Sequence, residues 1–428
     1  MKKSKYSKEE FSWIMYDWAD SVYSTIMLAT VFPTFFVEMA GGSGSPGSMW
    51  WGIGNAAANL SVGIIAPFIG ALIQFKGFKK RMLATFISLG VIFTFATAFV
   101  YTWQMLLLGY ILSRMMHASA FKVYDAFLPD VTTKNRMDKI SATGYAYGYI
   151  GGSTIPFAVS IALVMFGGQF GIDTAMAVRV SVIMTAVWWG VFSIPVLKNV
   201  HHKHEQEIPT GGKLQVIKAT WVNAIATGKK IMKNKALKFF IFAYFLYMDG
   251  VGTVITMATA FGAEIGLDTA MMISALFITQ LVAFPFSLLF GRLADKFGSV
   301  NLITGAIIMY CFICIVGFIM GFGLEENLFG YDVATILFFV LAALVGTVQG
   351  GIQAISRSTF GKLIPPEESG NYFGFFEIFS RFATILGPGL YALILGLTGR
   401  ASFSILSIML VFFAGLIILV RGRKYISV

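Results

Sequence analysis

The 428-residue chain is 57% hydrophobic, only 12% charged and carries a formal net charge of +11. Ordinary soluble domains hold about 25% charged residues. The apolar residues also form about twelve segments near the ~20 residues that a helix needs to cross a bilayer. Too little chain lies outside them for a separate soluble catalytic domain. The segments lie near 11–38, 49–74, 82–101, 104–128, 139–166, 176–197, 236–262, 270–292, 300–322, 333–361, 371–397 and 401–420.

The basic residues alternate between the predicted loops, which indicates membrane topology and not nucleic-acid binding. One set of loops and both ends hold Lys2, Lys3, Lys5, Lys8, Lys76, Lys79, Lys80, Arg81, Lys122, Lys134, Arg136, Lys139, nine lysines from Lys198 to Lys238, Arg421, Arg423 and Lys424. The opposite loops hold Glu264, Asp268, Glu325, Glu326 and Asp332, with only Arg179 and Arg400 as basic residues. The positive-inside pattern predicts cytoplasmic termini. We expect a multi-pass protein of the plasma membrane, in contact with lipid.

The two halves of the chain repeat the same motifs in the same order. The matches are Asp20-Ser21-Val22 with Asp249-Gly250-Val251, Gly70–Gly77 with Gly291–Gly298, Gly144-Tyr145 with Gly374-Phe375, and Pro129 with Pro365. The offsets are 229, 221, 230 and 236. Such a parallel duplication predicts an all-α polytopic membrane protein of twelve transmembrane helices in two pseudo-symmetric six-helix bundles. We expect bundles at 1–197 and 236–428, joined by a cytoplasmic linker at 198–235 with an amphipathic helix from Lys213 onward.

Four charged residues fall near the predicted middle of the membrane. At ~1.5 Å of rise per residue, Asp20 and Asp249 lie about 14 and 15 Å into their helices, and Arg114 and Arg381 come out at a similar depth. Charges are costly in hydrocarbon and mark transport pathways, so we expect the four to face a shared cavity. Each acid has two interpretations: substrate binding or proton coupling, and a static ion pair with an arginine.

Other candidates surround these charges. Glu377 precedes Arg381 by one helical turn, which is compatible with an internal ion pair or with a proton switch. Arg114 can clamp a carboxylate through its planar fork or pair with Asp17 or Asp20. His117 is either a proton relay or a helix contact. The remaining candidates for a polar binding surface are Tyr16, Tyr23, Tyr247, Gln349 and Gln353.

The loops after the second and eighth segments are candidate gates. Their residues are Gly70, Gln74 and Gly77 in the first half, and Gly291, Asp295 and Gly298 in the second. Asp295 can approach the positive N-terminal end of a neighbouring helix, and Gln74 replaces that charge by a weaker hydrogen bond.

Nothing in the sequence indicates an enzyme. Cys311 and Cys314 form a Cys-x-x-Cys inside an apolar helix, where packing is the simpler role. The cluster His201-His202-Lys203-His204 could bind a metal, but a solvated linker is the simpler interpretation, and no Walker-type loop is visible. We therefore expect no cofactor and no metal site, and energy from an ion or solute gradient.

The Gly-x-Leu-Ala-Asp-x-x-Gly loop at Gly291–Gly298, with its degraded copy, resembles the major facilitator superfamily. Further stretches resemble the branch of the autophagy-related vacuolar effluxers and their bacterial relatives: Tyr16-Asp17-Trp18-Ala19, Phe127–Asp130, Ala243–Gly250, Gly346–Gly351, Ser356-Arg357-Ser358, Phe373–Phe376 and Gly387-Pro388. The resemblance implies an alternating-access carrier, and its vacuolar members are associated with amino-acid export. Where relatives usually carry Asn, this chain has Asp20.

These observations predict a monomeric secondary active transporter that moves a small polar or zwitterionic solute, with protons as the expected coupling ion. The 42 Phe and 21 Met leave a second interpretation open, a lipid or amphipathic-drug exporter. A third is a membrane sensor or scaffold without turnover.

Overall fold

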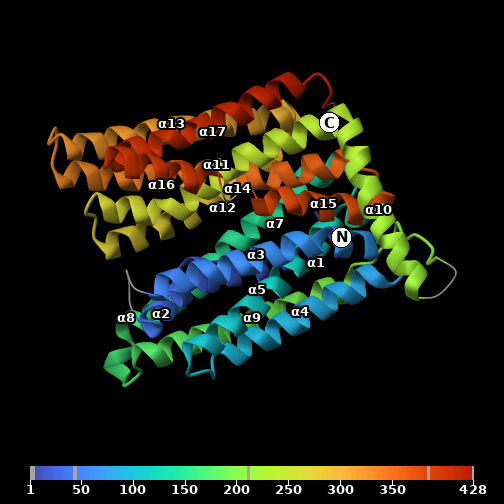
Figure 1. Cartoon of the computed structure of the whole chain (residues 1–428), viewed down its shortest axis with the longest axis horizontal. Coiled ribbons are helices and arrows are strands. Elements are labelled where there is room, and N and C mark those ends of the chain that lie inside the picture. The colour runs from blue at the N-terminus through green and yellow to red at the C-terminus, as the bar shows by residue number, and fades with distance from the viewer. Residues whose placement is uncertain (1–4, 42–45, 210–212, 383–385, 427–428) are drawn as a thin grey trace. The chain divides into compact units, whose positions relative to one another are not determined.

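The computed structural model describes residues 5–41, 46–209, 213–382 and 386–426, apart from the side chains at 46, 213–214, 259–260, 269–270 and 380–382. Helices make up nearly all of this part of the chain (Figure 1). The α-helices are α1 Lys8–Tyr23, α2 Val31–Met39, α3 Pro46–Leu72, α4 Phe78–Thr97, α5 Trp103–Ala126, α6 Leu128–Val131, α7 Met137–Tyr147, α8 Ile155–Phe166, α9 Thr174–Asn199, α10 Lys213–Lys233, α11 Lys235–Glu264, α12 Thr269–Phe297, α13 Ser299–Glu325, α14 Tyr331–Leu363, α15 Ser369–Phe382, α16 Leu386–Thr398 and α17 Ala401–Gly422.

The predicted hydrophobic segments are helical. Within the described residues, ten helices are long and apolar enough to cross a membrane. The other two predicted segments are α5 and the consecutive helices α15 and α16, of which residues 383–385 lie outside the description. Helix α5 carries the charged residues Arg114, Lys122 and Asp125, which lower its mean hydropathy.

Two segments expected as single helices are interrupted by π-helical turns. Segment 11–38 divides into α1, the π-helix η1 Ser24–Ala29 and α2, and segment 139–166 into α7, the π-helix η3 Gly148–Thr154 and α8. The glycines of η3 let it approach α1 closely, since a Cβ on Gly152 would lie 2.6 Å from the Trp18 carbonyl oxygen. Such π turns are rare and occur frequently at functional sites.

The chain divides into two compact units, each with a short segment from the other half of the sequence. Unit 1 comprises Met1–Lys134, Tyr147–Thr227 and Pro365–Ile378, and unit 2 comprises Asn135–Ala146, Gly228–Ile364 and Phe379–Val428. The first part of α15 therefore packs in unit 1, and most of α7 packs in unit 2.

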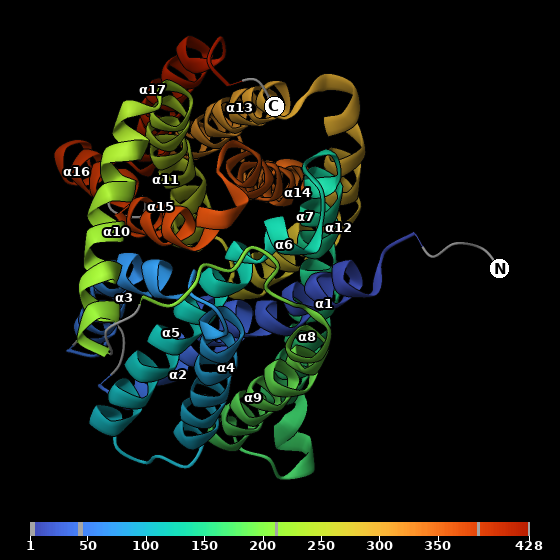
Figure 2. The same cartoon turned by 90° about the vertical axis from the view of Figure 1, so that its right-hand side faces the viewer.

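Each unit has its own helix contacts. In unit 1, α4 packs against α5 and α9, and α1 packs against α9 and η3 (Figure 2). In unit 2, α12 packs against α14, α11 against α17, and α13 against both α14 and α17 (Figure 1). Backbones approach most closely at glycines: a Cβ on Gly70 would lie 2.5 Å from the Gly370 carbonyl oxygen. Small residues at such crossings are typical of membrane helices.

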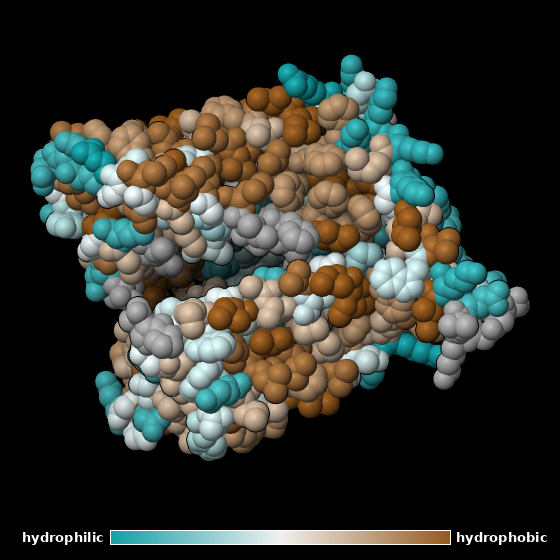
Figure 3. All heavy atoms as spheres, viewed as in Figure 1, coloured by the Kyte–Doolittle hydropathy of each residue, from teal (hydrophilic) through white to brown (hydrophobic). Residues whose placement is uncertain are grey.

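Apolar side chains cover much of the face shown in Figure 3, and hydrophilic side chains gather toward the helix ends. Ile64 is 65% exposed, Ile336 63% and Leu410 62%. Large apolar side chains in such positions are stable against lipid. Because lipid offers no hydrogen-bond partners, the backbone of a spanning element has to bond internally, as it does in a helix.

The predicted amphipathic helix is α10. Its apolar side chains Trp221, Val222 and Ile225 are 53%, 57% and 59% exposed, while Lys218, Lys229 and Lys230 interrupt the same sequence. Trp221 contacts the ring of Phe68 in α3 at 5.8 Å between centroids. This composition suits a helix at a lipid–water interface.

Candidate functional site

Helix α1 presents one face of candidate residues to the interior of unit 1. A capping box starts the helix, in which the Ser7 hydroxyl accepts from the Glu10 backbone N–H and the Glu10 carboxylate accepts from that of Ser7. The spacing of Tyr16, Asp20 and Tyr23 by four and three residues then places them on a single face. All three are buried.

Asp20 contacts α5 through His117. Its Oδ1 lies 2.9 Å from Nε2 of His117, and Nδ1 of the same ring lies 3.2 Å from Nη1 of Arg114. A guanidinium only donates hydrogen bonds, so Nδ1 accepts and carries no proton. In the neutral ring this assigns the proton to Nε2, the nitrogen that lies nearest to the Asp20 carboxylate. We call these three residues the relay cluster.

Aromatic and hydroxyl groups enclose the relay cluster. The Tyr23 ring stacks on His117 with 4.1 Å between centroids, and its hydroxyl accepts from Ser113 at 2.9 Å. Trp189 of α9 meets His117 edge-on at 5.4 Å, and its Nε1 lies 3.4 Å from the Tyr16 hydroxyl. The imidazole is thus fixed on both faces, which holds its two nitrogens on Asp20 and Arg114.

The other acid of this helix, Asp17, faces a tyrosine. Its Oδ2 accepts from the Tyr124 hydroxyl at 2.9 Å, and Tyr124 stacks on Trp13 at 4.4 Å. Of the partners considered for Arg114, Asp20 is connected to it through His117, which contacts both residues.

Glu377 lies opposite a lysine of α5. Its Oε2 is 2.8 Å from Nζ of Lys122, which also lies 3.3 Å from Oδ2 of Asp125. The sequence grouped Lys122 with loop lysines, but it lies inside α5 with its side chain 12% exposed, because the two carboxylates balance its charge.

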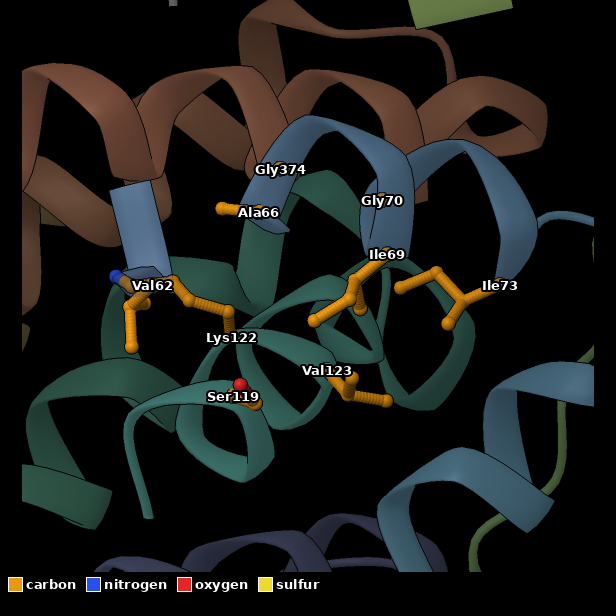
Figure 4. A pocket seen from close by; sticks show the side chains of 9 residues that line it. All are labelled: Val62, Ala66, Ile69, Gly70, Ile73, Ser119, Lys122, Val123 and Gly374. Atoms are coloured by element: carbon orange, nitrogen blue, oxygen red, sulfur yellow. The ribbon is translucent and has the colours of Figure 1, made fainter. Parts of the chain in front are cut away.

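Figure 4 shows Lys122 lining a small pocket between α3, α5 and α15, with Gly70 and Gly374 on the pocket wall. Its volume of about 10 Å³ holds at most one water.

In unit 2 the predicted residues lie on α11 and α14. The Tyr247 hydroxyl and Ser356 Oγ are 2.7 Å apart. Asp249 is fully buried, and a Cβ on Gly387 of α16 would lie 3.0 Å from its Oδ2. Gln349 is buried and Gln353 half-buried. The side chain of Arg381 lies outside the described residues, so its expected pairing with Glu377 stays a prediction.

The predicted gate residues have different surroundings in the two units. Gly70 meets α15, and a Cβ on Gly291 would lie 2.7 Å from Cβ of Ala142. Gln74 is buried, and its backbone oxygen accepts from the Gln206 N–H at 2.9 Å. Gly77 and Gly298 adopt positive φ angles of 75° and 78°. The Asp295 side chain is exposed.

An acid does meet the start of α13, but it is Asp138. This residue of α7 accepts from the hydroxyls of Ser299 and Ser358 and from Nζ of Lys362. Beside it, Arg357 donates to Oγ of Ser141 at 2.9 Å. The sequence analysis missed this cluster, and the one available signal was the clustering of ionic residues at the predicted ends of segments 5 and 10.

Unit 1 holds a second buried ion pair that the sequence analysis did not select. Nζ of Lys79 lies 2.8 Å from Oδ2 of Asp130, and both side chains are 0% exposed. Nζ also donates to Ser369 Oγ at 3.1 Å, while Asp130 Oδ1 accepts from the backbone N–H groups of Lys203 and His204.

Comparison with known proteins finds a matching family model and curated relatives of the same family. A family model described as "Vacuole effluxer Atg22 like" matches residues 53–423. The "Uncharacterized MFS-type transporter YxiO" of Bacillus subtilis is 37% identical over 422 residues, which are 97% of this chain and 95% of that protein. Autophagy-related protein 22 of Yarrowia lipolytica is 27% identical over 67% of this chain. The chain spans about half the length of that fungal relative, 51% of which is matched.

Solved structures of transporters share the fold. The human organic anion transporter MFSD10 superposes with a TM-score of 0.68 at 14% identity, covering 96% of this chain and 99% of that one. The proton:xylose symporter XylE superposes with a TM-score of 0.66 at 14% identity, covering 98% and 94%. At this level of identity the likeness shows the fold alone.

Proposed function

Because the chain belongs to the Atg22-like family of major facilitator superfamily transporters, we propose that it is a proton-coupled secondary transporter of a small zwitterionic solute of the amino-acid class. The transporter class and the multi-pass helical fold follow from the family. The solute, the coupling ion and the residues that act are our proposal, and the relay cluster is the observation that carries it.

The coupling follows from the hydrogen bonds of His117. In its neutral form Nδ1 accepts from Arg114, and Nε2 faces the Asp20 carboxylate at 2.9 Å. A second proton on the ring would place an N–H at Nδ1 against the guanidinium, so that two donors and two positive charges face each other. Protonation of His117 therefore favours release of Arg114.

A released Arg114 offers a planar fork to a carboxylate. Arginine binds carboxylates through two parallel hydrogen bonds, and the acidic group of an amino acid matches this geometry. A proton on His117 and a carboxylate on Arg114 then favour each other's binding, and the coupling is reciprocal. Such linkage makes solute and proton move in the same direction across the membrane.

A second acid completes the proposal. Asp249 is buried in α11, and it is the repeat counterpart of Asp20 in the sequence. A buried carboxylate is suited to bind an ammonium group or to exchange a proton during the cycle. Asp249 is our candidate for that role.

The test is transport by the purified protein in proteoliposomes with an imposed pH gradient. The panel comprises neutral, acidic and basic amino acids, organic anions and a sugar. We expect gradient-driven accumulation of an amino acid, and loss of it in Asp249→Asn. The control is Asp332→Asn, which changes an exposed acid at the start of α14. Wild-type accumulation and pH dependence in Asp249→Asn contradict the role of this acid, and a panel without any transported amino acid contradicts the solute class.

A further inference from the structure

Unit 2 contains a cavity to which the proposed function assigns no role. It has a volume of about 90 Å³ and lies between α11, α12, α13, α14 and α17. One water needs about 10–15 Å³ on this measure. The cavity therefore has room for several waters or for a compact apolar group.

The cavity persists because α12 and α14 already touch beside it. A Cβ on Gly346 would lie 2.8 Å from the Thr279 carbonyl oxygen and equally close to Cβ of Val282, so these backbones have no room to approach further. The wall of the cavity is mostly apolar, with Val254, Leu276 and Phe338 among its residues. Unfilled space lined by such side chains lacks dispersion contacts, which a ligand of matching shape would supply.

Two amide side chains interrupt the apolar wall. Gln280 enters from α12 and Gln349 from α14. Among the residues that the structure describes, Oε1 of Gln280 is buried without a hydrogen-bond partner. Gln349 is 7% exposed. A buried acceptor without a partner is costly, and here Gln280 lines a cavity in which a ligand's donor can reach it.

We propose that this cavity binds the apolar group of a solute that carries a hydrogen-bond donor, a hydroxyl or an amine, with the donor on Oε1 of Gln280. None of the residues that line the cavity is charged, so a bare carboxylate is not its occupant. The proposal rests on the proposed function in one respect, that the occupant is a transported solute. It places the apolar part of that solute, with one hydrogen-bond donor beside it, in this cavity.

Three variants test the cavity: one fills it, one removes its hydrogen-bond acceptor, and one controls for a substitution in the same helix outside the cavity. Ala275→Phe places a ring into the cavity from α12, since Ala275 is 3% exposed and lines it. Gln280→Leu keeps the side-chain volume but removes the acceptor. The control is Leu281→Phe, at a neighbouring position that is 42% exposed and does not line the cavity.

The experiment measures the melting temperature of the purified full-length protein in detergent against ligand concentration. The probes are 2-phenylethanol and its methyl ether, which has the same ring but no donor. We expect the alcohol to raise the melting temperature of the wild type and of Leu281→Phe, with the ether having a smaller effect. Non-specific partitioning into detergent gives the opposite order, because the ether is the more apolar probe, and that order would overturn the proposal.

The second readout is the ligand-induced shift in melting temperature of the variants. Ala275→Phe abolishes the ligand-induced shift, and Gln280→Leu weakens binding of the alcohol about fivefold to tenfold, the effect of one hydrogen bond. Without ligand, Gln280→Leu melts at the same or a higher temperature, since a buried acceptor has been removed; a merely misfolded variant melts lower. Unchanged binding in both variants would overturn the proposal.

Transport assays with the same variants distinguish this proposal from the proposed function. A solute that is accumulated equally by wild type and Ala275→Phe leaves the transporter assignment intact and removes the cavity from its path. Ligand binding that depends on Gln280, in a protein that transports no amino acid of the panel, supports the cavity as a binding site and contradicts the proposed solute class.

Discussion

Lys79 and Asp130 form a fully buried ion pair, with 2.8 Å between Nζ and Oδ2. It ties α4 to α6, and Asp130 Oδ1 also accepts from the backbone at Lys203 and His204. We predict that Lys79→Met lowers the free energy of unfolding by about 3–5 kcal/mol, because it leaves a carboxylate buried without its cation. The measurement is thermal and denaturant unfolding in detergent.

The double variant distinguishes charge from packing. Asn at position 130 keeps an acceptor for the backbone N–H groups but carries no charge, so Lys79→Met combined with Asp130→Asn should recover most of the loss. A double variant as unstable as Lys79→Met alone would show that the lost packing of the lysine side chain, and not the unpaired charge, accounts for the effect.

The contact of α3 with α15 in unit 1 depends on glycines. A Cβ on Gly374 would lie 2.7 Å from the Ala66 carbonyl oxygen. Overpacking of this kind costs about 1–3 kcal/mol, so Gly374→Ala should lower the melting temperature. The control is Gly389→Ala in α16, where nothing lies within 4 Å of the new Cβ and the helix gains about 0.5–1 kcal/mol. Equal effects of the two substitutions would contradict the close approach.

Arg357 holds α7 in unit 2. Its Nε donates to Ser141 Oγ and its Nη2 to the Ser141 carbonyl, and its guanidinium lies 4.5 Å from the Tyr145 ring. We predict that Arg357→Lys costs about 1–3 kcal/mol, since a lysine cannot satisfy both acceptors from this position. Arg292→Lys, at an exposed position of α12, is the control. Unfolding curves that coincide for the two variants would argue against this anchoring role.

His202, in the connection after α9, gives a pH dependence that can be tested. Burial, and then the nearby charge of Lys79, lower the pKa of His202 to about 4 from its ordinary 6.5, against the opposite effect of Asp130. Between these values the unfolded chain binds a proton that the folded protein does not, so stability falls as pH drops from about 6.5 to 4. Below that range the contribution of His202 no longer changes.

The variant His202→Asn removes this titration, and we expect a shallower loss of melting temperature between pH 6.5 and 4. The neighbouring residues His204 and Glu205 remain in place. The control is His201→Asn, at an exposed position, which keeps the contribution of His202. An unchanged slope in His202→Asn would contradict the assignment.

Hydropathy and repeat matching predicted the helical segments well, because the cost of exposing backbone and charge to lipid acts on every residue of a segment. They did not predict the π turns. Those depend on tertiary contacts, such as the fit of Gly151 and Gly152 against Trp18. Interruption of an otherwise apolar helix leaves no trace in its mean hydropathy.

The contacts of the candidate site residues could not be predicted from the sequence, and the role of these residues stays a prediction. Asp20 and Arg114 were recognisable as charges at one depth, yet the contact between them runs through His117. Glu377 was matched to Arg381 by helical spacing, and the structure shows a contact with Lys122 of α5 that spacing did not predict. Both contacts join helices distant in the sequence, so their side-chain partners could not be read from spacing within one helix.

The central claim is that His117 couples proton and solute binding, and the most direct measurement compares two transport modes of His117→Gln. Glutamine can still donate to Asp20 and accept from Arg114, but it cannot titrate near neutral pH. With the solute identified by the panel, we expect the variant to keep solute exchange across proteoliposomes at equal pH and to lose accumulation driven by a pH gradient. Accumulation by His117→Gln to the wild-type level, with the wild-type pH dependence, would contradict the account.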